Sequence, residues 1–174
     1  MRLIVSSIAL LIALIPTGCG IYSFSGASIS SDIKTISILN FPNEATLGPS
    51  TMSVTFIEKI KDYYQQNTNL AIVDENGDLQ IEGYIADYRV TPVTASASQN
   101  QNQGDFASLT RVTIEVFASY VNTKDDEFDF ERKFSFFVDF DQNSVDLSAN
   151  EQQFVEEIFD QIIFDIFNAS VANW

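Results

Sequence analysis

The sequence predicts an α+β fold: a two-layer sandwich with a mainly antiparallel sheet of four or five strands and two helices packed on one of its faces. Three long segments in the middle of the chain alternate apolar and polar residues, which is typical of antiparallel strands with one face in water. Two further segments repeat apolar residues at helical spacing. Because the elements follow in the order β-α-β-β-β-α, both helices are expected to cover the same sheet face.

Length and composition limit the function classes. The 174 residues suffice for one domain with a processed end. Nine Lys and Arg against 24 Asp and Glu give a net charge of −15, which repels a nucleic-acid backbone. The chain has no His and one Cys, which excludes Ser-His-Asp hydrolysis, C-x-x-C redox chemistry and a zinc cluster. We predict a protein that is not an enzyme and has no cofactor, no metal and no nucleic-acid partner.

The chain begins like a secreted precursor. The apolar run from Leu3 to Ile15 is too short to cross a bilayer, which takes about 20 helical residues, but it has the length of a signal-peptide core. The following Pro16-Thr17-Gly18-Cys19 resembles a lipobox, where bacterial lipoproteins are cleaved before a cysteine that becomes acylated. This cysteine is the only one in the chain. The segment therefore predicts a lipoprotein signal peptide over residues 1–18 and lipidation at Cys19.

Lipidation at this cysteine implies a membrane location. Each buried acyl methylene contributes about 0.8 kcal/mol, so two or three chains on Cys19 would anchor the protein permanently. Gly20 stands where an Asp would suggest retention in the inner membrane. We expect the lipid to hold the mature chain in the outer membrane, facing the periplasm. Residues 19–33 would then form a tether and residues 34–174 the folded domain.

The first half of that domain contains a strand, a helix and a short second strand. Residues 34–41 (KTISILNF) are short and rich in β-branched residues, as strands are. A helix follows, in which apolar residues recur at a spacing of four: Met52, Phe56, Ile60 and Tyr64. It is expected to end at residues 67–69, before a short strand over 70–73.

Three long strands are predicted next, over residues 79–93, 109–122 and 128–140. The apolar alternation of the first slips by one residue, which predicts a β-bulge or a strong bend near Asp87. The third carries an apolar stripe interrupted by a single arginine: Phe128, Phe130, Phe134, Phe136, Val138 and Phe140. The connection over residues 94–108 is polar and rich in Gln and Asn.

The last segment is a second amphipathic helix. Ser148 and Glu151 have the spacing of a capping box, which predicts its first turn. A wide apolar stripe then runs along one side of the helix: Phe154, Val155, Ile158, Phe159, Ile162, Ile163, Ile166 and Phe167.

A series of short motifs covers most of the mature chain: Gly-Ile-Tyr-Ser-Phe-Ser-Gly over 20–26, KTISILNF over 34–41, Gly77-Asp78-Leu79 with Gly83 and Tyr88, Arg111 to Val116, and Asp165 to Asn168 with Val171 and Trp174. In this order the motifs resemble the LptE family of lipopolysaccharide-assembly outer-membrane lipoproteins. The order of strands and helices is also similar to that family. The resemblance implies a non-enzymatic subunit that plugs the large LptD-type outer-membrane β-barrel, helps it assemble and assists lipopolysaccharide delivery. It assigns no lipopolysaccharide-contact residue here.

Basic residues on the long strands are the candidates for direct contact with lipopolysaccharide phosphates. Arg111, Arg132 and Lys133 are weak candidates, since strand register decides whether they meet. The alternative, which we favour, is cross-strand pairing with acidic residues: Glu115, Asp129 or Glu131. The run Asp139-Phe-Asp141-Gln-Asn143 begins like a calcium loop but lacks its glycine and its bidentate Glu, so a solvated strand end is favoured.

Two further alternatives stay open. The polar residues 94–108 are either a contact for the barrel or a linker without a partner. The chain as a whole is, in a competing hypothesis, a free-standing periplasm-facing lipoprotein that binds an apolar or glycan ligand. The 15 Phe and 6 Tyr residues would then line a pocket, although their positions in strands and helices are those of core residues.

Overall fold

The computed structural model describes residues 29–94 and 108–171 and has the predicted α+β architecture. The predicted signal peptide, Cys19, most of the tether and the central part of the 94–108 connection lie outside the described residues. The elements follow in the order β1 (Thr35–Ile38), α2 (Met52–Asn67), β2 (Ala71–Val73), β3 (Leu79–Thr94), β4 (Ser108–Asn122), β5 (Phe130–Asp141) and α3 (Leu147–Ser170).

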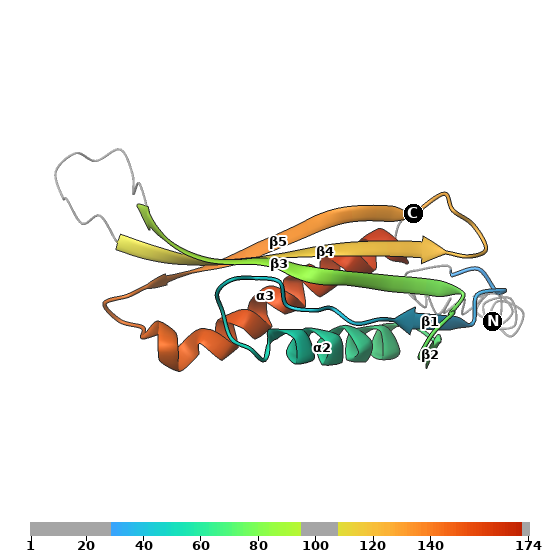
Figure 1. Cartoon of the computed structure of the whole chain (residues 1–174), viewed down its shortest axis with the longest axis horizontal. Helices are drawn as coiled ribbons and strands as arrows, with labels where there is room; N and C mark the ends of the chain where they lie inside the picture. Colours follow the sequence, from blue (N-terminus) through green and yellow to red (C-terminus); the bar gives the residue numbers. More distant parts are fainter. Residues whose placement is uncertain (1–28, 95–107, 172–174) are drawn as a thin grey trace, which may run out of the picture.

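The strands form one mixed five-stranded sheet in the order β2-β1-β3-β4-β5. β3, β4 and β5 pair antiparallel along most of their length, whereas β1 pairs parallel with both β2 and β3. Both helices lie under the same face of the sheet, with the short strands β1 and β2 at one end of the molecule (Figure 1). The described part of the chain therefore has two layers, as the sequence predicts.

The helix α2 has the buried face that its spacing predicts. Its fully buried residues are Met52, Phe56, Ile60 and Tyr64. The helix ends where expected, because Thr68 is extended and both its N–H and its hydroxyl donate to the carbonyl of Tyr64. A polar side chain that bonds back in this way satisfies a carbonyl that the helix itself leaves free.

The predicted bulge in β3 is present between Ile85 and Asp87, where the pairing with β4 shifts by one residue. The shift keeps the apolar residues on both sides of it, Ile85 and Tyr88, buried on the same sheet face. The segment after β1 also bonds there, since Ile85 N–H donates to Pro42 O at 2.9 Å and Ile85 O accepts from Glu44 N–H at 3.0 Å. The bulge thus coincides with the point at which this segment leaves the sheet.

A line of aromatic rings in the core connects the segment after β1 with both helices. The ring of Phe41, three residues after the end of β1, lies 4.8 Å from that of Phe56 of α2, whose ring is 4.9 Å from that of Phe159 of α3. Phe41 fits because β3 has glycine beneath it. A Cβ on Gly83 would come within 2.6 Å of the Phe41 ring and 2.0 Å of the Phe117 carbonyl. All three Phe rings are fully buried, and such ring pairs add about 0.5–1.5 kcal/mol beyond their buried area.

The start of α3 differs from the prediction. The residue that caps the helix is Asp146, whose carboxylate accepts from the N–H of Ser148, so the expected Ser148–Glu151 capping box is wrong. Glu151 instead accepts a hydrogen bond from the Tyr88 hydroxyl at 2.7 Å. Asp146, two residues before Ser148, competes with Ser148 for the free N–H groups of the first turn. Glu151 is bonded to Tyr88 of β3 and therefore does not take part in the cap.

The start of β5 also differs. The strand begins at Phe130 rather than at Phe128, which lies in the turn after β4 and is 41% exposed. Phe134 and Phe140 are buried as predicted, and Phe136 and Val138 pack partly buried against the core. The predicted stripe is therefore correct for these four side chains and wrong for Phe128.

Asp78 joins the starts of β1 and β3 to the turn after β4. Its carboxylate accepts from the N–H groups of Lys34 and Thr35 and from the Thr35 hydroxyl, at 2.9–3.1 Å. Its Oδ1 lies 3.1 Å from Lys124 Nζ. The Lys34 N–H, then Lys124 and Thr35, hold the pKa of Asp78 well below its ordinary value.

Truncation of the shared core should destabilise the fold. Ile162→Ala and Phe134→Ala should each lower the free energy of unfolding by roughly 2–5 kcal/mol, because both side chains are buried between α3 and the sheet. Phe164→Ala on the exposed side of α3, where the ring is 45% exposed, is the control and should change it by about 0.5 kcal/mol or less. Urea unfolding followed by circular dichroism measures this. Equal effects of Ile162→Ala and Phe164→Ala would contradict the packing.

Acid should weaken the Asp78 contacts. A carboxyl whose folded-state pKa is lowered stabilises the fold above its unfolded pKa of 3.8, and that contribution is lost as the pH falls further. Asp78→Asn should therefore lower the Tm at pH 7, and the gap to wild type should shrink below about pH 4. Asp74→Asn in the exposed turn before β3 controls for the loss of one charge. A gap independent of pH would show that the carboxylate charge contributes nothing.

Candidate functional site

The face of β3, β4 and β5 that points away from the core is covered by neither of the two described helices. We call it the uncovered face. Alternation along the strands places on it the residues opposite in parity to the buried ones, which include Glu82, Tyr84, Asp87, Arg89, Arg111, Thr113, Glu115, Phe117, Lys133, Ser135, Phe137 and Asp139. It therefore combines aromatic rings with charges of both signs.

Aromatic rings lie on this face near its middle and near one end. Tyr84 and Phe117 stand opposite each other on β3 and β4 and stack with their ring centroids 5.1 Å apart and their planes at 22°. Both are half-buried, whereas Phe137 of β5 is 41% exposed. Aromatic residues in such positions are enriched where protein surfaces meet partners.

Arg111 is held by a carboxylate on the neighbouring strand. Its Nε and one terminal nitrogen donate to the two oxygens of Asp139 at 2.7 and 2.8 Å, and its guanidinium lies 3.5 Å from the centre of the Phe137 ring. The hydrogen bonds to Asp139 raise the pKa of Arg111, and those from Arg111 lower the pKa of Asp139. The predicted cross-strand pairing is thus present, but its acidic partner is Asp139 and none of the three expected residues.

Lys133 and Arg132 point to opposite sides of β5. Lys133 Nζ donates to Glu115 at 2.8 Å on the uncovered face, one of the partners that the sequence suggests, and this hydrogen bond raises the pKa of Lys133. Arg132 instead lies over the rings of Phe130 and Phe134, with its guanidinium carbon 5.1 and 4.8 Å from the ring centres. Since neighbouring residues of a strand face opposite ways, alternation alone separates these two candidates.

The three candidate cations do not form one cluster. Lys133 pairs in register with Phe117, six residues along β4 from Arg111, which corresponds to about 20 Å of extended strand. Arg89, which sequence reasoning did not single out, lies on the uncovered face and donates to Asp87 at 2.6 Å. The positive charge of Arg89 and its position on a predicted long strand are the features of the sequence that identify it as a further candidate. Each of the cations on this face therefore has its own carboxylate.

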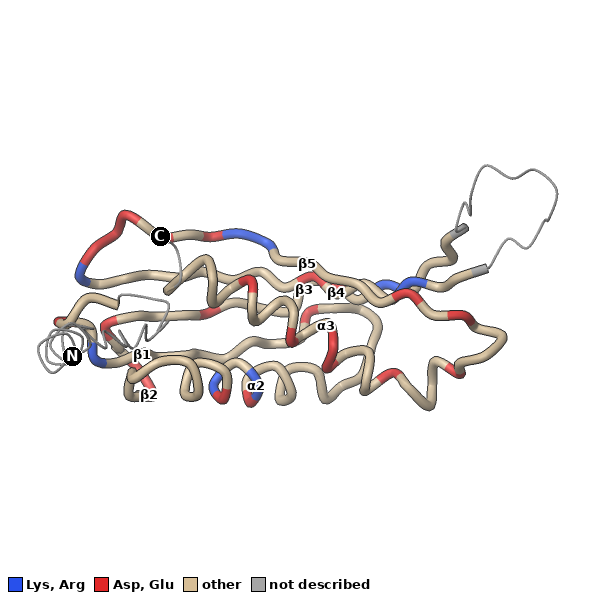
Figure 2. The backbone as a smooth tube through the Cα atoms, turned by 180° about the vertical axis from the view of Figure 1, so that it is seen from behind, with Lys and Arg blue, Asp and Glu red and all other residues tan. Residues whose placement is uncertain are grey.

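Acidic residues are spread along the described part of the chain, whereas basic residues are few (Figure 2). Besides those on the uncovered face, Lys59 bonds Asp160 at 2.6 Å between the two helices. Asp141 Oδ1 accepts from both the N–H and the side-chain amide of Asn143 at 2.9 Å, which is a turn at the strand end. Residues 29–94 and 108–171 contain no group of three side chains placed to hold a metal ion.

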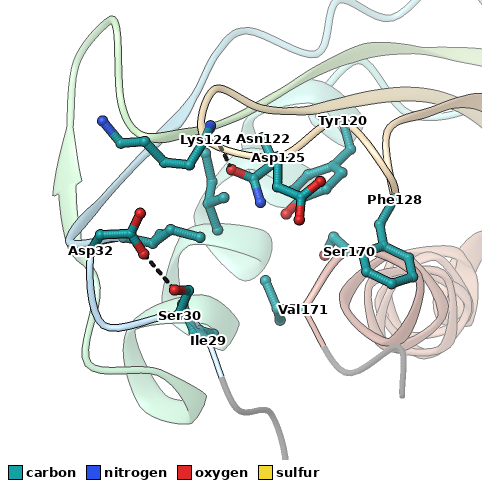
Figure 3. Close-up of a pocket in the computed structure, with 12 residues that line it drawn as sticks. Ile29, Ser30, Asp32, Tyr120, Asn122, Lys124, Asp125, Phe128, Ser170 and Val171 are labelled. Carbon is teal, nitrogen blue, oxygen red and sulfur yellow. Dashed lines mark hydrogen bonds between the residues drawn. The ribbon is translucent and has the colours of Figure 1, made fainter.

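A pocket of about 300 Å³ lies at one end of the domain, where residues 29–33, the turn after β4 and the end of α3 meet (Figure 3). Its buried lining comes from Ile33, Leu79, Tyr120 and Ser170. Burial, with a smaller effect of Asp129, raises the pKa of the Tyr120 hydroxyl to about 12, so the hydroxyl is neutral at physiological pH. We call this cavity the end pocket.

No described helix is both long and apolar enough to cross a membrane. The arrangement of the described residues thus offers a charge-paired aromatic face and a small pocket at one end of the domain.

Solved structures with a similar fold come from bacterial proteins. A minor lipoprotein from Acinetobacter baumannii is 12% identical, with a TM-score of 0.52, and covers 81% of this chain and 92% of its own. The protein CT253 from Chlamydia trachomatis is 11% identical, with a TM-score of 0.51, over 81% of this chain and 99% of its own. At these identities the likeness concerns the fold alone. A search of curated protein sequences gives no match.

The comparison with protein families gives a match over nearly the whole described domain. The profile of the LptE family, described as lipopolysaccharide-assembly, matches residues 33–170. This range runs from just before β1 to the last residue of α3 and includes most of the segments on which the resemblance in sequence depends, but not residues 20–26, Val171 or Trp174. The chain therefore belongs to the LptE family.

Proposed function

We propose that this protein is a lipid-anchored subunit of the lipopolysaccharide-assembly machinery of the outer membrane. In this proposal residues 1–18 are removed, Cys19 carries the acyl chains, residues 19–33 form the tether and residues 34–174 face the periplasm. Support comes from the lipobox-like Pro16-Thr17-Gly18-Cys19, from membership of the LptE family and from a fold like that of a minor lipoprotein.

The observation that carries the proposal is the uncovered face. Three long strands present a rigid, pre-ordered surface whose rings include the Tyr84–Phe117 stack and the 41% exposed Phe137. A rigid surface with aromatic anchors loses little side-chain entropy on contact with a partner. We propose that this face contacts an LptD-type β-barrel and that the protein works by filling and assembling that barrel.

The charge pattern favours this role over direct capture of lipopolysaccharide. The phosphates of that lipid would require free cations, but Arg111 and Lys133 are already bonded to Asp139 and Glu115. The net charge of −15 also repels an approaching anion, within the distance over which salt does not screen the charges. Direct contact through Arg111, Arg132 or Lys133 is therefore the less favoured role for these residues, and the proposed role needs no catalysis.

The competing role as a free-standing ligand-binding lipoprotein has less support. Most of the described Phe side chains pack in the core between the helices and the sheet, including Phe41, Phe56 and Phe159. The end pocket is at the lower limit of volumes that hold small ligands, about 300 Å³. A ligand binder would be recovered alone, whereas a barrel subunit is recovered with its barrel.

Loss of the acylated cysteine should release the protein from the membrane. Cys19→Ala leaves no thiol for lipid attachment, since the chain has one Cys, so the variant should move from the outer-membrane to the soluble periplasmic fraction. Fractionation and mass spectrometry of the N-terminal peptide measure this. An unchanged distribution, or a wild-type peptide without acyl chains, would refute the anchor.

A negative charge on the uncovered face should weaken the barrel contact. Phe137→Glu places a carboxylate within this face, so less barrel should be recovered when the full chain is purified from detergent-solubilised membranes through a C-terminal tag. Phe164→Glu on the exposed side of α3 is the matched control, since the two rings are 41% and 45% exposed. It should leave recovery unchanged. Equal recovery with both variants would exclude the uncovered face as the interface, and the absence of any barrel with wild type would contradict the proposed function.

A further inference from the structure

β5 is an edge strand that lacks most of the features by which a sheet edge is protected from further pairing. In the part of the chain that the structure describes, β5 pairs only with β4 and borders the sheet (Figure 1). The strand has twelve residues, no proline and no shift in its pairing register, whereas the other edge strand, β2, has three residues. Beside the first part of β5, residues 132–135 and the end of α3 line an open hollow. Because short strands, prolines and bulges are the usual protection of an edge, β5 is open to the addition of another strand.

The side of β5 that faces the helices is incompletely buried. Phe136 and Val138 of β5 are only partly buried. The residues opposite them on β4, Ile114 and Val112, are fully buried. The difference follows from position, because each of these β4 residues has a strand on both sides and each β5 residue has a strand on one side only. A further strand with apolar side chains opposite Phe136 and Val138 would remove the remaining apolar area from water.

The charges on the other side of β5 indicate what such a strand should carry. On the uncovered face, Lys133 lies near the start of β5 and Asp141 lies at its end. The side chain of Lys133 donates to Glu115 but is 58% exposed, and its ammonium group has three donors. Asp141 accepts from Asn143 through Oδ1, so its second oxygen can accept from another donor. A strand antiparallel to β5 should therefore be acidic where it passes Lys133 and basic where it passes Asp141.

The β5 strand of a second copy has this order of charges. When Phe137 of one copy stands opposite Phe137 of the other, Lys133 of each copy stands opposite Asp141 of the other. The remaining opposite pairs of this arrangement are Ser135 with Asp139, Phe134 with Phe140 and Phe136 with Val138. The pairs on the helix side are thus apolar, and the charged pairs on the uncovered face attract each other.

Other registers of the same antiparallel pair are less favourable. A centre one or two residues nearer the start of β5 places Glu131 opposite Asp141 or Asp139, and the two-fold axis repeats this repulsion. A centre one residue nearer the end of β5 separates Lys133 from Asp141. The charge pattern therefore selects the register centred on Phe137.

We propose that two copies of this chain associate through their β5 strands, antiparallel and centred on Phe137, so that two five-stranded sheets form one continuous sheet. Such an interface uses the same surface of both copies, so association ends at a dimer and covers the open edge. Strand addition takes place at the edge, so the uncovered faces of both copies stay accessible. The dimer therefore depends neither on the lipid anchor nor on the barrel contact.

Single cysteines test the register of the dimer. The full chain with Cys19→Ala, which leaves no other thiol, is purified in detergent and oxidised mildly. Phe137→Cys should form a covalent dimer, because residue 137 of each copy faces residue 137 of the other. Ser135→Cys alone should form none, since its two cysteines would lie about 13 Å apart along the strands, but a mixture with Asp139→Cys should. Phe164→Cys on the exposed side of α3 is the control and should form none.

Charge reversal tests the partner of Lys133. In sedimentation at about 0.15 M salt, where charges are screened beyond about 8 Å, Lys133→Glu should raise the dissociation constant of the dimer about tenfold, because two repulsions replace two attractions. The double variant Lys133→Glu with Asp141→Lys should restore it. The two positions lie about 26 Å apart within one β5 strand, so the rescue requires contact between two copies.

Three results would overturn the proposal. A wild-type chain that stays monomeric at high micromolar concentration would exclude the dimer and leave the edge to an extended segment of another protein, the other occupant that an edge strand accepts. Equal yields of covalent dimer from Phe137→Cys and Phe164→Cys would exclude β5 as the contact. A double variant that is no more dimeric than Lys133→Glu alone, with the circular dichroism of the folded protein, would exclude the register.

Discussion

Burial on one face of the sheet only is the constraint on which the rest of this structure depends. Both described helices pack under the same face of β3, β4 and β5, and that face carries the buried alternating residues of the long strands, such as Ile81, Ile114 and Phe134. The opposite face is therefore exposed to water. It is the face of the sheet that is available for contact with a partner. In a sheet of this kind, one side of each strand packs in the core and the other side faces water.

The magnitudes show which interactions hold the fold and which shape its surface. Full burial of a large apolar side chain is worth about 1.5–3 kcal/mol, whereas an exposed ion pair contributes about 0–1 kcal/mol. The Arg111–Asp139 and Lys133–Glu115 pairs are partly exposed, so they add little to stability beside the core. Their larger effect is to neutralise the cations of the uncovered face. The remaining features of that face, its rings and its rigidity, suit contact with a protein rather than with an anionic lipid.

Local patterns in the sequence predict a large part of this fold. The spacing of Met52, Phe56, Ile60 and Tyr64 identifies the buried side of α2, because a helix repeats its faces at fixed spacing. The slip in alternation locates the bulge of β3, since a single extra residue reverses which side chains face the core. Such features depend only on neighbours within one element.

Features that depend on contacts between distant elements are not predictable in this way. The parallel pairing of β1 with β2 and β3 joins segments that are distant in the sequence, and the choice of Asp139 as partner of Arg111 follows from the register of β4 and β5. Asp146 takes the cap of α3 while Glu151 bonds to Tyr88, a residue far away in sequence. For the candidate site, the sequence provides the residue types, and the register decides which of them meet.

The central claim, that the uncovered face is the barrel contact, is tested most directly by photo-crosslinking in intact cells. A photo-reactive phenylalanine in place of Phe117 would lie on this face, and one in place of Phe164 would lie on the exposed side of α3. The account predicts an adduct of this chain with an outer-membrane β-barrel from position 117, with a much weaker one or none from position 164. A barrel adduct from position 164 alone, or adducts only with lipopolysaccharide from position 117, would contradict it.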